Sequence, residues 1–213
     1  MILIIKRVVL IAALIFLSAF LAFADPSICQ KFPGGKVSGR GPFPYNCRLI
    51  DGHIWAGGHP LSPKKFDNSD GQVLSIMKFL KEMGVKDVVD LENSSAAQKR
   101  YGKLLAKAGL NRLHIPMSSS KVPTKDEWSK IKEKMKGPVY LHCRWGADRT
   151  GAVVARYLIE DCGYSTVEAW RAVISGGSHA GALGGLKRSP EYRNLILFIS
   201  PQAAGNKVFK EYF

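Results

Sequence analysis

The chain has 213 residues, 46% of them hydrophobic and 23% charged, and its formal net charge at pH 7 is +14. This length is sufficient for one domain with a full hydrophobic core. The positive charge favours anionic partners such as phosphorylated small molecules or anionic lipid headgroups. Because the sequence has no dense basic block and no zinc-finger or single-strand-binding pattern, we expect no nucleic-acid partner.

Residues 1–24 have the features of a secretory signal peptide. Lys6 and Arg7 precede an apolar run over 8–21, and Ala-Phe-Ala at 22–24 is a small-x-small cleavage pattern. The alternative is an uncleaved anchor, but the run is shorter than the about 20 residues that span a bilayer. Cleavage removes two basic residues, which leaves 29 basic and 17 acidic residues, or +12. We therefore expect an exported protein, periplasmic or secreted, with no membrane span after cleavage.

Residues 25–48 are rich in Pro and Gly, lack periodicity and are predicted to form an extended arm. In an oxidising compartment, Cys29 and Cys47 could form a disulfide that ties this arm down. None of the four cysteines belongs to a Cys-x-x-Cys pair, so the sequence predicts neither a metal site nor a cofactor. Cys162 is interpreted as a small buried hydrophobic residue.

Helical and strand patterns alternate along residues 49–200. The predicted elements, in order, are a hairpin over 49–55, a helix over 72–83 capped by Ser69 or Asp70, a strand over 85–91, a helix over 95–108 closed by Gly109, a strand over 112–116, a helix to Lys136 capped by Thr124 and Glu127, a strand over 139–143, and helices over 150–161, 165–174 and 189–199. This alternation predicts a single α/β domain over 49–200, with a mainly parallel sheet between helices and a tail over 201–213.

The strongest signal is the segment His-Cys-Arg-Trp-Gly-Ala-Asp-Arg-Thr over 142–150, which joins a buried strand to a helix. A loop that opens a helix places several backbone N–H groups around one point, where the helix dipole favours an anion. Cys143 would lie at the base of this loop, and Arg149 could hold two oxygens of a tetrahedral oxyanion. Helix N-termini and neighbouring cations favour the nucleophilic thiolate of a cysteine. The segment therefore predicts attack of sulfur on phosphorus and a cysteinyl-phosphate intermediate.

The match at His142, Cys143, Arg149 and Thr150, with Gly146 between them, resembles the signature of cysteine-dependent protein tyrosine and dual-specificity phosphatases. Residues 51–60, 84–91 and 113–116 also look like small bacterial and fungal members, so the resemblance covers about 49–199. It implies a sheet flanked by helices and a phosphatase for a phosphorylated protein, lipid or inositol phosphate. We expect the protein to be a monomer.

The resemblance also implies roles for the residues of the loop. Cys143 is the expected nucleophile, His142 would fix the loop through the backbone, and Thr150 would hydrogen-bond the sulfur. The residues expected to bind phosphate are Arg144, Trp145, Gly146, Ala147, Asp148 and Arg149, with Trp145 as a wall of the pocket.

One departure concerns the general acid. Many family members carry an aspartate on the loop that follows the strand ending here at Pro116, whereas residues 117–122 contain no carboxylate. Asp148, inside the phosphate loop, is the preferred candidate, and Asp126 is the second. Asp126 also suits a dipole-stabilising carboxylate in a first helical turn, and Asp148 a structural cap.

Two other functions fit the same pattern. One is a non-catalytic anion-binding module, because an oxidised Cys143 cannot attack phosphorus. The other is a rhodanese-like sulfurtransferase, although those loops usually have one residue fewer between cysteine and arginine. Within the phosphatase reading, phosphotyrosine, phosphoproteins and polyanionic small phosphoesters all remain open as substrates.

Overall fold

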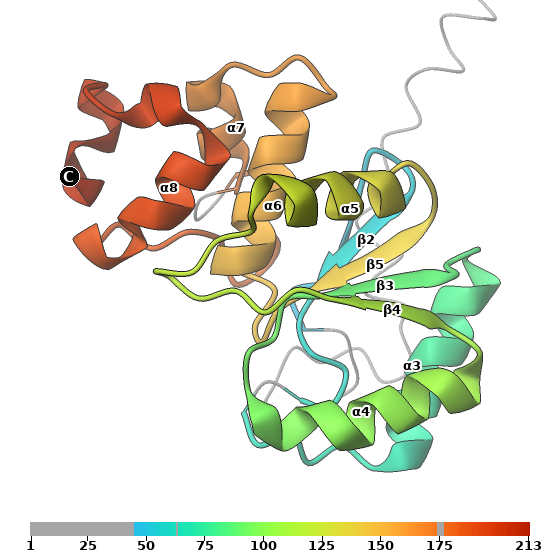
Figure 1. The fold of residues 1–213 in the computed structure, drawn as a ribbon. Helices are drawn as coiled ribbons and strands as arrows, with labels where there is room; N and C mark the ends of the chain where they lie inside the picture. The colour runs from blue at the N-terminus through green and yellow to red at the C-terminus, as the bar shows by residue number, and fades with distance from the viewer. Residues whose placement is uncertain (1–44, 63, 174–176) are drawn as a thin grey trace, which may run out of the picture.

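A sheet lies at the centre of the computed structural model (Figure 1), which describes residues 45–62, 64–173 and 177–213, and this sheet has five strands. The strands are β1 (Arg48–Ile50), β2 (Ile54–Gly57), β3 (Asp87–Asp90), β4 (Asn111–His114) and β5 (Val139–His142), in the spatial order β1-β2-β5-β3-β4. The pair β1–β2 is antiparallel and the other pairs are parallel. The predicted signal peptide, Cys29 and most of the arm lie outside the described residues.

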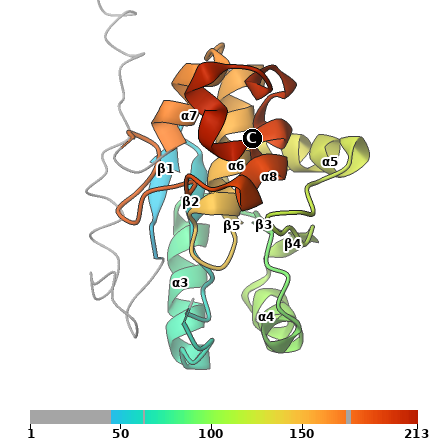
Figure 2. The ribbon, with the colours of Figure 1, turned by 90° about the vertical axis from the view of Figure 1, so that its left-hand side faces the viewer.

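Helices cover both faces of the sheet (Figures 1 and 2). One face carries α3 (Asp70–Glu82) and α4 (Ser95–Ala108), and the other carries α5 (Lys125–Met135), α6 (Asp148–Glu160), α7 (Thr166–Val173) and α8 (Arg193–Ile199). The predicted single α/β domain with a mainly parallel sheet is thus confirmed. None of the helices in the described ranges is long and apolar enough to cross a membrane.

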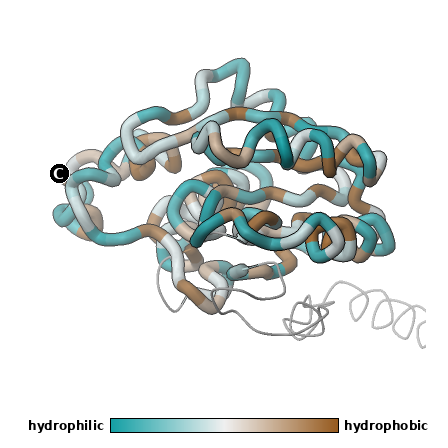
Figure 3. The backbone as a smooth tube through the Cα atoms, turned by 90° about the horizontal axis from the view of Figure 1, so that it is seen from below, coloured by the Kyte–Doolittle hydropathy of each residue, from teal (hydrophilic) through white to brown (hydrophobic). Residues whose placement is uncertain are grey.

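The central strand β5 separates two hydrophobic cores. Val139 and Leu141 point into the core beneath α5, α6, α7 and α8, whereas Tyr140 points into the core beneath α3 and α4. Successive side chains of a strand point to opposite faces, which is why an unbroken apolar run suits a strand covered on both sides. Hydrophobic and hydrophilic residues alternate along the helices in Figure 3, as expected for helices with one buried face.

Local capping signals set the helix boundaries. Ser69 and Gln72 form a capping box at the start of α3, and Thr124 and Glu127 form another at the start of α5. Gly109, with φ +67°, ends α4 in the left-handed conformation. The observed strands are up to three residues shorter than predicted, and α6 begins two residues earlier than expected, at Asp148.

The C-terminal segment is packed rather than loose. The helix predicted over 189–199 consists of the 3-10 turn η1 (Pro190–Tyr192) followed by α8, and residues 201–213 form η2 (Pro201–Ala203) and η3 (Lys207–Tyr212). Phe209 and Tyr212 are fully buried against Trp170, whose indole Nε1 donates to the Tyr212 hydroxyl. The segment predicted as a tail therefore belongs to the packed domain, because its aromatic side chains complete the core over α7.

Candidate functional site

The phosphate loop, defined here as residues 143–149, lies at the carboxyl end of the central strand. Cys143 directly follows β5 and is only 2% exposed, and the loop enters α6 at Asp148. The carboxyl edge of a parallel sheet is where ligands of such folds bind. The fold thus places the predicted nucleophile at the base of a loop that opens a helix.

Glycines allow β2 to approach this loop closely. Gly146 has φ +69°, and a Cβ there would lie 2.3 Å from the carbonyl carbon of Gly57. A Cβ on Gly58 would lie 2.8 Å from the Cβ of Tyr45. Glycine adopts a left-handed backbone without a steric penalty and lets two backbones approach closely, so the loop and the end of β2 fix each other.

Two carbonyl groups of the loop are held from behind. The N–H of His59 donates to the Arg144 carbonyl at 2.9 Å, and the Gly146 carbonyl accepts from Arg48 Nη1 at 2.6 Å and from Asn46 Nδ2 at 3.0 Å. In a trans peptide the C=O and the following N–H point in opposite directions. The N–H groups of Trp145 and Ala147 therefore point away from these anchors, and they donate no hydrogen bond within the part of the chain that the structure describes. Unpaired amides beside a helix N-terminus make a site for an anion.

Arg149 is held at the rim by the turn after β3. Its Nη1 donates to the carbonyls of Leu91 and Met117, each at 3.1 Å, and to Asn93 Oδ1 at 3.2 Å. Its Nη2 lies 3.1 Å from Oε2 of Glu92, a carboxylate that is 1% exposed. Among the described residues, Arg149 Nε has no partner and is available to an oxyanion. Sequence reasoning missed Glu92, although an acidic residue just after a neighbouring parallel strand was a usable signal.

His142 fixes the backbone beside the nucleophile. Its Nδ1 lies 3.3 Å from the Cys143 carbonyl, and its Nε2 lies 3.0 Å from the Tyr101 hydroxyl. Burial lowers the pKa of His142 below its usual range, which favours the neutral ring. Since the carbonyl can only accept, Nδ1 carries the proton, and Tyr101 donates to Nε2.

A buried polar cluster adjoins His142. His59, Asp90 and His142 offer atoms that all lie within 4.8 Å of one another, a set that could hold a metal ion. Asp90 accepts from Arg112 and from the Glu92 N–H, and a metal ion would have to displace Tyr101 from His142. Burial lowers the pKa of His59 well below its usual range. The pairing of β5 with β2 and β3 brings these three residues together from distant parts of the chain.

Asp148 occupies the first turn of α6 and lies in the predicted loop. Its Oδ1 accepts from the Lys187 N–H at 3.1 Å. Burial raises the pKa of Asp148 above its usual range, against the hydrogen bond and the charge of Lys187. A raised pKa suits a group that must donate a proton near neutral pH. The second candidate, Asp126, is exposed in the first turn of α5.

Three further residues depart from the expected arrangement. The Thr150 hydroxyl is buried without a partner among the described residues, so the predicted bond to sulfur is not formed here. The ring of Trp145 packs edge-on against Tyr45, with centroids 5.7 Å apart, which directs it toward the core of α3 and α4. Arg144 lies over the Phe66 ring and donates to the Lys64 carbonyl at 3.0 Å.

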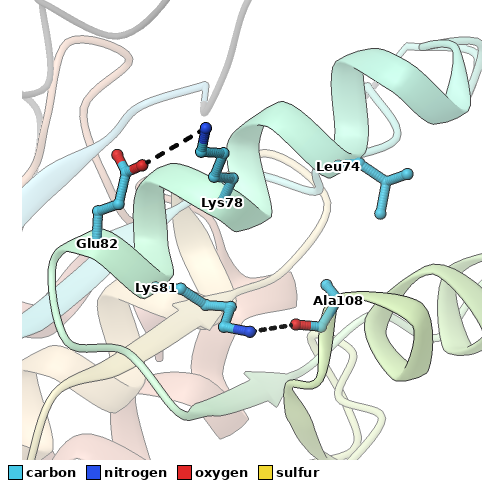
Figure 4. A pocket seen from close by; sticks show the side chains of 5 residues that line it. All are labelled: Leu74, Lys78, Lys81, Glu82 and Ala108. Atoms are coloured by element: carbon cyan, nitrogen blue, oxygen red, sulfur yellow. Dashed lines mark hydrogen bonds and ion pairs between the residues drawn. The ribbon is translucent and has the colours of Figure 1, made fainter.

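A separate pocket of about 410 Å³ lies between α3 and α4 (Figure 4). It is lined by Leu74, Lys78, Lys81, Glu82 and Ala108 and includes no residue of the phosphate loop. Lys81 Nζ donates to the Ala108 carbonyl, and Lys78 pairs with Glu82. The pocket brings together no set of catalytic or metal-binding side chains.

Comparisons with known proteins agree with this geometry. A family model described as "Polymorphic toxin system, DSP-PTPase phosphatase" matches residues 69–163, a span that includes the whole phosphate loop. The chain is similar to phosphatases of this group. No match was found among curated proteins.

Solved structures share this fold. Pseudomonas aeruginosa TpbA is 19% identical, with a TM-score of 0.51 over 79% of this chain and 89% of that one. PTPMT1 in complex with PI(5)P is 22% identical, with a TM-score of 0.52 over 74% and 99%. Tk-PTP in the active form is 18% identical, with a TM-score of 0.53 over 74% and 97%. At these identities the likeness establishes the fold.

Proposed function

We propose that this protein hydrolyses phosphomonoesters through a cysteinyl-phosphate intermediate. The observation that carries the proposal is the phosphate loop itself: a buried Cys143 beneath unpaired amides at a helix N-terminus, with Arg149 held at its rim by Glu92. This arrangement suits a tetrahedral dianion, and the family model that includes the loop is a phosphatase model.

The reaction has two steps. The Cys143 thiolate attacks phosphorus, the S–P bond forms, and the P–O bond to the leaving group breaks as that oxygen takes a proton from Asp148. Water then attacks phosphorus and gives its proton to the Asp148 carboxylate, while the S–P bond breaks and inorganic phosphate and the thiolate are released. The buried Thr150 hydroxyl can rotate to hydrogen-bond the departing sulfur.

The proposed substrates are phosphotyrosine, phosphoproteins or polyanionic small phosphoesters. The charge of Arg144, a residue of the loop whose guanidinium lies over Phe66, and the excess of basic residues favour a substrate with more than one negative charge. The structural neighbour PTPMT1 was solved with the phosphoinositide PI(5)P, which supports the inclusion of phosphorylated lipids in this set. We also propose that the protein is exported, based on the signal-peptide pattern of residues 1–24, and that it acts as a monomer.

The test is hydrolysis of an aryl phosphate by wild type, Cys143→Ser and Cys162→Ser. Cys162 is the matched control, because it is also a free cysteine but lies at the end of α6 away from the loop. We expect Cys143→Ser to lose turnover yet still bind tungstate, and Cys162→Ser to keep wild-type rates. Wild-type turnover in Cys143→Ser would refute the mechanism, and release of thiocyanate from thiosulfate and cyanide would support sulfur transfer instead.

A further inference from the structure

The residues before and after Cys47 hold the phosphate loop from behind. Asn46 Nδ2 donates to the Gly146 carbonyl at 3.0 Å, and Arg48 Nη1 donates to the same oxygen at 2.6 Å. Asn46 is 1% exposed and Arg48 6% exposed, so water competes little for these bonds. One loop carbonyl is thus fixed by two side chains that flank a single cysteine.

The same two side chains hold the glycine-rich segment that follows α7. Asn46 donates to the carbonyls of Ala180 and Gly184 and accepts from the Leu183 N–H, and Arg48 Nε donates to the His179 carbonyl at 2.8 Å. Gly181 touches the Asn46 side chain so closely that a Cβ there would lie 2.3 Å from Oδ1. Asn46 and Arg48 therefore join three parts of the chain at the back of the loop.

Cys47 is itself disulfide-bonded. Its predicted partner, Cys29, lies outside the described residues, so that pairing stays a prediction. A disulfide holds the Cα atoms of its two cysteines about 4.4–6.8 Å apart, which limits how far the backbone beside each cysteine can move. It therefore acts on the two residues that hold Gly146.

We infer that Asn46 and Arg48 are positioning residues of the phosphate loop, and that the Cys47 disulfide between them maintains the conformation that binds a phosphoryl group. This inference rests on the proposed function. Holding the Gly146 carbonyl behind the loop directs the Ala147 N–H to the opposite side, where the anion binds. Asn46, Arg48 and the Cys47 disulfide together form a brace behind the loop. Without this brace the 146–147 peptide can rotate, and a donor to the anion is lost.

Arg48 adds a buried positive charge close to the nucleophile. Burial lowers the pKa of Arg48 to about 10, and the neighbouring Cys143 acts in the opposite direction by favouring the charged guanidinium. Arg48 Nη2 is buried without a partner among the described residues, which leaves this charge incompletely paired.

Two cysteines of the protein must then be in opposite redox states. Cys143 must be reduced to attack phosphorus, whereas Cys47 must be oxidised to hold the loop. A dithiol reductant such as dithiothreitol would convert the Cys47 disulfide into two thiols while being oxidised to its own cyclic disulfide. An oxidising compartment assembles the brace, and the buried position of Cys143 limits access of oxidants to its sulfur.

The experiment measures tungstate affinity through intrinsic tryptophan fluorescence, and aryl phosphate turnover, on the full chain after oxidative folding. Cys47→Ser, Arg48→Met and Arg48→Lys are compared with wild type and with the control Cys162→Ser, after urea unfolding has verified that each is folded. We expect Cys47→Ser and Arg48→Met to bind tungstate about tenfold or more weakly, since a hydrogen bond to a charged group is lost. Arg48→Lys should recover part of the affinity by restoring the charge, a rescue that a merely structural role would not give.

Equal tungstate affinity in wild type, Cys47→Ser and Arg48→Met would overturn the inference, as would a wild type that binds no tungstate. If Arg48→Met does not fold, Cys47→Ser and Arg48→Lys decide. Tungstate binding needs no turnover, so a wild type that binds tungstate but leaves aryl phosphate intact rejects the proposed function and still tests the brace. Cys29→Ser should match Cys47→Ser if these two cysteines pair.

Discussion

Arg149 and Glu92 form an ion pair with Nη2 and Oε2 3.1 Å apart, although 57 positions separate them in the chain. Glu92 also accepts from the Ser94 N–H through its other oxygen, so a second contact, independent of the arginine, orients its carboxylate. The pair makes the fork of Arg149 a preorganised group, in which Nη1 and Nη2 contact protein and Nε remains for substrate.

Glu92→Gln should lower kcat/KM for an aryl phosphate about fivefold, because a neutral acceptor holds a guanidinium about 1 kcal/mol less strongly than a carboxylate does. Arg149→Lys should lose most activity, since lysine keeps the charge but has no planar fork. Steady-state kinetics checks both. Asp70→Asn is the control, because it weakens the exposed Arg100–Asp70 pair outside the site. Unchanged kinetics in Glu92→Gln would remove Glu92 from the proposed arrangement.

Asp148→Asn should slow hydrolysis according to the leaving group. An alkoxide needs a proton as it departs, so alkyl phosphates should lose about 10²–10⁴-fold, whereas nitrophenyl phosphate should lose little. Asparagine keeps the acceptor for the Lys187 N–H, which preserves the structural contact. The measurement is kcat across a series of esters with different leaving-group pKa values. An equal loss along the series would make Asp148 structural and turn attention to Asp126.

Asp148 should also affect stability in a pH-dependent way. Burial raises its pKa in the folded state, so the folded state binds the proton more tightly than the unfolded state. Its favourable contribution is complete below the usual aspartate pKa of about 3.9 and is lost as pH rises through the raised value. Asp148→Asn should therefore be more stable than wild type at neutral pH, with the difference shrinking at acid pH. Urea midpoints at several pH values test this. The exposed Asp126→Asn is the control, and a constant difference across pH would contradict the shift.

Gly146→Ala should abolish anion binding, whereas Gly52→Ala should not. Both glycines have φ +69°, but a Cβ at Gly52 meets nothing within 4 Å, whereas one at Gly146 would overlap Gly57. The shared backbone strain costs about 1–3 kcal/mol, and the overlap adds about 1–3 kcal/mol at Gly146 alone. Tungstate affinity and urea midpoints separate the two effects. If both variants bind tungstate equally, the contact with β2 does not shape the loop.

The sequence was sufficient for features encoded over a few neighbouring residues. The Thr124–Glu127 capping box and the hairpin at Asp51-Gly52 each depend on side chains within one turn, and both were predicted. The strand, loop and helix around Cys143 belong to the same class. These local signals and the βα alternation together predicted the fold class.

The supporting residues could not be predicted, because topology decides which distant segments meet. Glu92 meets Arg149 only because β3 pairs with β5, and Asn46 meets Gly146 only because β2 brings the start of β1 beneath the loop. The buried Phe209 was also missed, because the segment around it has no periodicity long enough to predict a packed helix.

The central position of β5 links the stability of the site around Cys143 to the stability of the whole domain. β5 is paired with a strand on each edge and covered by a core on each face, so its amide hydrogens can exchange with solvent only when the sheet opens. Fraying at a terminus or a surface loop does not displace the residue that follows this strand. Heat should therefore inactivate such a site together with cooperative unfolding, rather than by early local opening.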